Sequence, residues 1–106
     1  MAELILKRSN RKDKKFKITN PESPDKWIHF GAKGLEDFTI HKDPERRRKW
    51  LKRMSRIKNK QGKLIIYQPT SPLFWSWQLL WNKPSIEASA TDIKKNFGWN
   101  IRFEQN

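Results

Sequence analysis

Residues 71–81 read Ser-Pro-Leu-Phe-Trp-Ser-Trp-Gln-Leu-Leu-Trp, and this aromatic stretch decides the expected fold. Ser71 followed by Pro72 is typical of a helix start, because a serine side chain caps the first turn and proline fits its first position. At about 100° per residue, three large rings lie on one face of this helix: Phe74, Trp77 and Trp81. A stripe of this kind predicts a helix that packs its rings into the core.

Trp75 points away from that stripe, so we expect it to be an exposed contact for a partner, with a buried position as the alternative. Only 35% of the 106 residues are hydrophobic, while six are Trp. A chain this short has a small core, and most of its large rings are needed to build one.

A second helix is expected upstream, from Asp43 to about Asn59. Asp43 can cap it, Pro44 suits its first position, and Glu45 favours the positive end of the helix dipole. An apolar stripe runs along it: Trp50, Leu51, Met54 and Ile57. Cations make up the rest of the surface: Arg46, Arg48, Lys49, Lys52, Arg53, Arg56 and Lys60.

Short stretches with β-prone or alternating side chains flank the two helices. The expected strands are Glu3–Lys7, Lys15–Thr19, Trp27–Phe30, Phe38–Ile40, Lys63–Gln68 and Trp99–Phe103, with a loop over Asn20–Asp25. A third, short helix is expected over Ala90–Phe97, capped by Thr91 and ended by Gly98. The pattern predicts a small single α+β domain with a few short antiparallel strands, one basic amphipathic helix and one Trp-rich helix. We expect residues 1–25 to form a basic, partly extended N-terminal arm and residues 26–106 to form the compact domain.

The positive charge is concentrated in two segments. The chain has 24 Lys and Arg against 11 Asp and Glu, a formal net charge of +13. Residues 7–17 hold seven of these cations and 46–63 hold ten with no acid between them. Solvated helices usually mix signs, so such runs predict contact with a negatively charged partner. The residues expected to make that contact are Lys12, Lys14, Lys15, Arg46, Arg48, Lys49, Lys52, Arg53, Arg56, Lys60 and Trp75.

Several classes of protein and site are disfavoured. The sequence contains no apolar run of 18 residues, so it predicts no membrane-spanning helix. It also contains no cysteine, which excludes disulfides and thiolate metal sites. His41 and Asp43 lie close in sequence, but no nucleophile motif, metal-ligand spacing or glycine-rich phosphate loop accompanies them. We therefore expect Asp43 to cap a helix and His41 to bond locally, and we predict no catalytic residue, no metal and no cofactor.

Two blocks of sequence carry a resemblance to a known family. The first is Phe-Gly-Ala-Lys-Gly-Leu-Glu-Asp-Phe-Thr-Ile-His-Lys-Asp at 30–43, continuing to Arg46 and Arg53. The second is Phe-Trp-Ser-Trp-Gln-Leu-Leu-Trp-Asn-Lys-Pro-Ser-Ile at 74–86. In this order and spacing the chain resembles, over residues 26–96, a family of small basic proteins encoded by large nucleocytoplasmic DNA viruses. The family has no established enzymatic activity to carry over, and the resemblance implies a viral source. From that source we expect a virion protein made in the host cytoplasm or nucleus.

Two functions follow as hypotheses. The first is a minor capsid component that binds acidic surfaces of neighbouring capsid proteins through the arm, the basic helix face and Trp anchors, within a larger assembly. The alternative is a non-specific nucleic-acid-binding protein that packages or condenses the viral genome. Sequence alone does not separate an acidic protein from nucleic acid, since both require the same charge.

Overall fold

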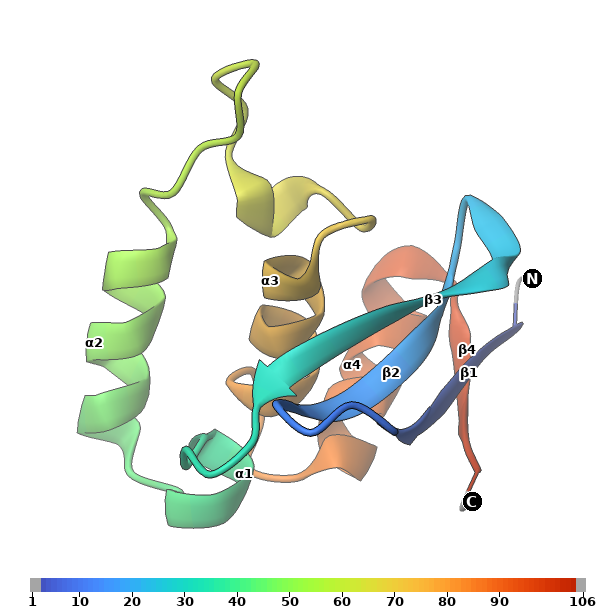
Figure 1. Cartoon of the computed structure of the whole chain (residues 1–106). Coiled ribbons are helices and arrows are strands. Elements are labelled where there is room, and N and C mark those ends of the chain that lie inside the picture. Colours follow the sequence, from blue (N-terminus) through green and yellow to red (C-terminus); the bar gives the residue numbers. More distant parts are fainter. Residues whose placement is uncertain (1–2, 105–106) are drawn as a thin grey trace.

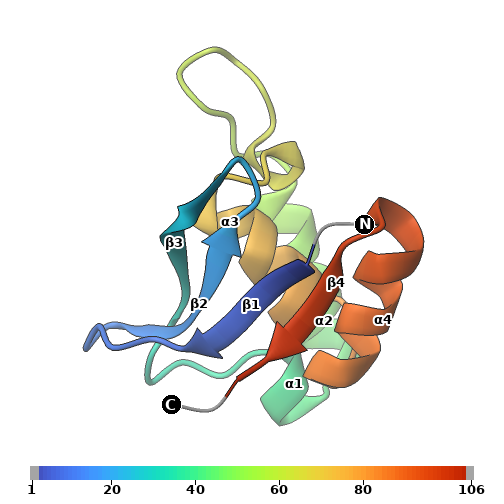
Figure 2. The same ribbon diagram turned by 90° about the vertical axis from the view of Figure 1, so that its right-hand side faces the viewer.

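A computed structural model of the chain describes residues 3–104. Its centre is a four-stranded sheet in the order β3-β2-β1-β4, with all helices packed on one side (Figures 1 and 2). The strands are β1 (Glu3–Arg8), β2 (Lys14–Asn20), β3 (Ser23–Ala32) and β4 (Asn100–Phe103). Strands β1 to β3 are antiparallel neighbours, whereas β4 runs parallel to β1, so the sheet is mixed rather than wholly antiparallel. The predicted α+β single domain is confirmed.

Alternation of apolar and polar side chains fixes the register of the sheet. On the inner face Leu6 of β1 pairs with Ile18 of β2, which pairs in turn with Ile28 of β3. All three side chains are buried, as are Leu4 and Phe30. A slip of one residue would move this set to the opposite face, so burial of one face specifies the pairing.

The basic N-terminal segment differs from the expected division at residue 25. Its described part forms β1, β2 and the start of β3, and Leu4, Leu6 and Phe16 lie in the core. The cations alternate with these apolar residues, so the same segment supplies both core and charged surface. Residues 1 and 2 lie outside the described residues.

The aromatic stretch forms α3 (Pro72–Trp75) and continues as one wider turn, η2 (Ser76–Leu80), across the inner face of the sheet. Ser71 caps it by accepting from the Leu73 amide, as predicted. The wider turn is a π-helix, closed by a hydrogen bond from the Trp81 amide to the Ser76 carbonyl. Phe74, Leu79 and Leu80 are buried together with Trp81.

The prediction of an exposed Trp75 is wrong, because its side chain is fully buried. Its indole Nε1 donates to the Pro69 carbonyl at 2.7 Å, and its ring packs 5.6 Å from that of Trp99. The prediction failed because it assumed a helix with a single buried face, whereas this helix has neighbours on more than one side.

Helix α2 (Pro44–Met54) begins as predicted, since the Asp43 carboxylate accepts from the amides of Glu45 and Arg46. It ends at Met54, with Ser55 as its C-cap, earlier than expected. A loop follows, closed by the Lys58–Leu64 bridge.

Two predicted strands are wrong. Residues 38–40 belong to the short helix α1 (Phe38–His41), because the Asp37 side chain caps it. Residues 63–68 contribute only the bridge at Leu64 and the short helix η1 (Ile65–Tyr67), since neither edge strand of the sheet pairs with them.

Helix α4 (Ile86–Phe97) starts earlier than expected, at Ser85 rather than Thr91. Ser85 accepts from the Ala88 amide at 3.1 Å, and the helix ends at Gly98, whose positive φ of 78° completes the predicted stop. The short connection from Gly98 leads directly into β4, beside β1.

Trp75→Ala should lower the free energy of unfolding by about 3–5 kcal/mol, because it leaves a cavity and an unpaired carbonyl in the core. Urea unfolding followed by circular dichroism measures this change. Tyr67→Ala is the matched control, since Tyr67 is 69% exposed and should change stability by less than about 0.5 kcal/mol. Equal unfolding midpoints for the two variants would contradict the core role of Trp75.

Candidate binding groove

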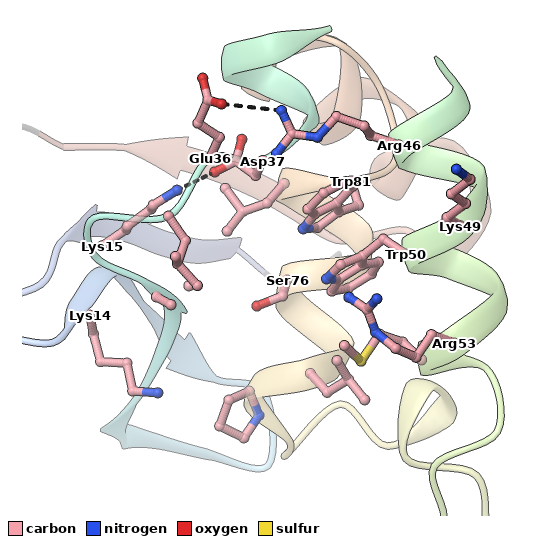
Figure 3. Close-up of a pocket in the computed structure, with 17 residues that line it drawn as sticks. Lys14, Lys15, Glu36, Asp37, Arg46, Lys49, Trp50, Arg53, Ser76 and Trp81 are labelled. Carbon is pink, nitrogen blue, oxygen red and sulfur yellow. Dashed lines mark hydrogen bonds and ion pairs between the residues drawn. The ribbon is translucent and has the colours of Figure 1, made fainter. Parts of the chain in front are cut away.

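A hollow of about 630 Å³ lies between α2 and the edge of the sheet, with the start of α3 at its base (Figure 3). Five cations line it: Lys14, Lys15, Arg46, Lys49 and Arg53. Apolar side chains lie among them: Leu35, Met54, Leu73 and Leu80, with the rings of Trp50 and Trp81. Glu36 and Asp37 supply its two carboxylates. We refer to this hollow and its lining as the basic groove.

The helical repeat of α2 directs one of its faces toward the basic groove. Arg46, Trp50 and Arg53 recur three or four residues apart and line one wall. Trp50 stacks on Trp81 with ring centroids 4.6 Å apart and an interplanar angle of 4°. This stack attaches α2 to the core and so holds that wall of the groove in position.

Arg47 holds the other side of α2 in place. Its Nε donates to the carbonyls of Trp81 and Asn82, at 2.8 and 3.1 Å. These bonds satisfy two carbonyl groups that follow η2, so Arg47 has a structural role and does not line the groove.

The opposite wall depends on Gly31. Its φ is +80°, and a Cβ there would lie 2.8 Å from Cδ1 of Leu80. Only glycine allows the end of β3 to approach η2 this closely, so a larger residue would push the wall of the groove outward.

A buried ion pair ties β2 to α1 beside the groove. Lys15 Nζ lies 2.7 Å from Asp37 Oδ2, with side-chain exposures of 14% and 4%. The other Asp37 oxygen accepts from the Thr39 amide at 2.9 Å and also from the Thr39 hydroxyl. Asp37 therefore serves both as the helix cap and as the counter-ion of Lys15.

The remaining charges of the groove do not cancel. Arg46 pairs with Glu36 at 3.1 Å, and both side chains are about half exposed. Lys14, Lys49 and Arg53 have no ion pair within residues 3–104. Five cations against two carboxylates leave the groove with three uncompensated positive charges.

The structure brings five of the eleven predicted contact residues together, the five cations of the groove. Arg48 and Lys52 are exposed on the other side of α2, and Arg56, Lys60 and Lys12 are exposed in loops. Arg48 pairs with Glu45, and this hydrogen bond, reinforced by the arginine's charge, lowers the pKa of Glu45. Trp75 is in the core and is not a contact residue.

Sequence reasoning missed the groove's carboxylates and its exposed leucine. Glu36 and Asp37 follow Leu35, which is 66% exposed, in the loop before α1. An adjacent pair of acids in a strongly basic half of the chain was the available signal.

Of the two histidines, His41 has a local structural role. His41 Nδ1 accepts from the Asp43 amide at 2.9 Å and its ring packs 5.2 Å from that of Trp81, as expected of a locally bonded residue. His29 lies on β3, away from the groove. Across residues 3–104, no three His, Cys, Asp or Glu side chains are grouped to hold a metal ion. No described helix has the length and apolar character needed to cross a membrane.

Comparison with protein families gives a match to the N-terminal part of the chain. Residues 4–54 are similar to a family of unknown function, DUF5754. The matched segment runs from β1 to the end of α2 and contains all five groove cations. The chain matches no curated protein and no solved structure.

Asp37→Ala should lower the free energy of unfolding by about 3 kcal/mol, because it removes the cap of α1 and leaves the Lys15 ammonium largely buried without a counter-ion. Urea unfolding measures the loss. Adding Lys15→Met to Asp37→Ala should restore part of it, while Glu36→Gln should cost less than about 1 kcal/mol. No recovery in the double variant would mean that the Lys15–Asp37 pair does not account for the loss.

Proposed function

We propose that this protein is a non-enzymatic binding protein that holds an acidic segment of another protein in the basic groove, as a minor structural component of a viral particle. The observation that carries the proposal is the groove itself, with uncompensated cations around an apolar floor. A segment with carboxylates and one apolar side chain would match both features.

The mixture of charges in the groove favours a protein over nucleic acid. The Glu36 carboxylate is about half exposed at the groove, where it would repel a phosphate backbone but could accept from amides or cations of a peptide. Leu35 offers apolar surface that a phosphate chain does not use. Non-specific binders of duplex nucleic acid instead depend on cations that contact the phosphates.

The viral part of the proposal is supported by the resemblance of the two sequence blocks, at 30–43 and 74–86. The tryptophans that were expected to anchor a partner do not support the viral proposal at this groove. Trp75 and Trp81 are buried, and Trp50 packs against the core, so these rings stabilise the domain. Contact with acidic capsid neighbours would depend on the groove cations and Leu35.

Replacing Lys14, Lys49 and Arg53 with Gln should weaken binding of a fluorescein-labelled peptide of alternating Glu and Leu by about tenfold, since three partly exposed ion pairs are lost. Fluorescence anisotropy at physiological salt measures this affinity. The matched control replaces Arg48, Lys52 and Arg56 with Gln, which removes the same charge from surfaces outside the groove and should change affinity by less than about threefold.

Two results would overturn the protein-binding proposal. One is an equal loss in the groove variant and its control, because the site would then be the whole charged surface. The other is tighter binding of duplex DNA than of the peptide, with a steep salt dependence in both variants.

The viral location is tested separately, on purified and fractionated virions of the source virus. We expect the protein in the shell fraction, cross-linked to capsid proteins through lysines at the groove, such as Lys14 and Lys49. Mass spectrometry of cross-linked intact particles gives both readouts. Recovery with the DNA-containing core alone would exclude the capsid role.

A further inference from the structure

The outer face of the sheet is the second charged surface of the molecule, and it lies opposite the helices. In Figure 2 the four strands stand in front of α2, α3 and α4, and no helix covers their outer side. The alternation that buries Leu6, Ile18 and Ile28 places their chain neighbours on this face. We refer to it as the outer sheet face.

Trp27 is the large aromatic residue of the outer sheet face. It lies on β3, opposite Thr19, and 38% of it is exposed. Lys17 Nζ is 4.7 Å from the centroid of its ring, and Lys7 Nζ is 5.9 Å from it. Trp50, Trp75, Trp81 and Trp99 pack in or against the core, whereas this ring is exposed and flanked by cations.

A second ring lies two residues along the same strand. His29 stands opposite Lys17, and its Nδ1 lies 2.7 Å from the Ser9 hydroxyl, which also accepts from the Arg11 amide at 3.0 Å. Partial burial, followed by the charges of Arg11 and Lys17, lowers the pKa of His29. Burial and the nearby cations therefore both favour the neutral form of the imidazole.

These observations match the chemistry of one ligand. Single-stranded nucleic acid binds where bases stack on exposed rings and cations reach the phosphates. Alternate residues of a strand are about 7 Å apart, so Trp27 and His29 can each take one of two successive splayed bases. We propose that the outer sheet face binds single-stranded nucleic acid, with Trp27 as the main stacking platform and Lys17 and Lys7 as phosphate contacts.

Carboxylates on this face would repel the phosphates of a bound nucleic acid. Glu3 and Glu104 lie at the β1–β4 side, where they pair with Arg102. Lys7 also reaches Glu104, at 3.7 Å. Away from Glu3 and Glu104, the cations near Trp27 and His29 lie on β2 and in the hairpin before it, where Lys17, Arg11 and Lys12 outnumber Asp13.

The proposal does not depend on the basic groove, because the two sites share no residue. A duplex is a poor ligand here, since its bases are already stacked and its contact would be limited to phosphates. An acidic peptide could meet the lysines, but it offers no base to stack on Trp27.

The test is fluorescence anisotropy with a labelled oligothymidylate and a duplex of equal charge. Trp27→Ala should weaken oligothymidylate binding about tenfold, whereas Trp27→Phe should retain most of it, because a ring remains for stacking. Lys17→Gln should reduce the slope of log affinity against log salt by about 0.7, the value for one phosphate contact on a single strand. Tyr67→Ala, another exposed aromatic on a different element, should bind as the unchanged protein does.

Three results would overturn this site. They are absence of oligothymidylate binding at low salt, wild-type affinity in Trp27→Ala, and equal affinity for single strand and duplex. A fourth is loss of Glu-Leu peptide binding in Trp27→Ala, which would mean that the face takes a protein.

The groove variant separates the two proposals, since it should lose the peptide but keep the Trp27-dependent part of oligothymidylate binding. Thermal unfolding of each variant verifies that the fold is intact.

Discussion

The rest of the structure depends on burying a short aromatic helix on more than one side. Phe74 and Trp75 of α3 and Leu79 and Leu80 of η2 are all buried, although the two elements together span only residues 72–80. So short a helix is marginal alone and needs tertiary packing. The sheet packs under it, and Trp99 packs beside it, close to the rings of Phe74 and Trp75. A helix surrounded in this way explains how a chain with few hydrophobic residues forms a core: each large ring is shared between two layers.

The same constraint leaves a groove at the surface. No residue of α2 is fully buried, and Trp50 is its main ring contact with the core. Because the inner face of the sheet is already covered by α3 and η2, α2 stands away from β3 (Figure 1). The space between them is lined by side chains from α2, β2, the loop before α1, α3 and η2, and these include lysine, arginine and leucine. Charge in the groove is thus a consequence of which positions the core does not use.

Helix starts and stops could be predicted from the sequence, because they depend on neighbouring residues. Burial and strand pairing could not, because they depend on residues distant in sequence. The caps at Asp43 and Ser71 and the stop at Gly98 depend on neighbouring backbone groups, so short motifs identify them. Trp75 was misplaced because its burial depends on Trp99, a residue distant in sequence. Residues 63–68 have a strand-like composition, but the sheet is complete without them. The five groove cations were predicted as contacts, yet their convergence from β2 and α2 requires the fold.

The two charged surfaces differ in the chemistry around their cations, and this difference is more informative than the net charge. In the basic groove, cations alternate with carboxylates and exposed aliphatic carbon, which suits a ligand that has both signs and apolar groups. On the outer sheet face, the cations flank an exposed ring, which suits a ligand with planar bases and phosphates. The surfaces lie on opposite sides of the sheet, so the two ligands we propose would bind without competing. In that case the protein would join an acidic protein surface to a nucleic acid strand. Its excess of positive charge would then serve two contacts, each of which neutralises one part of it.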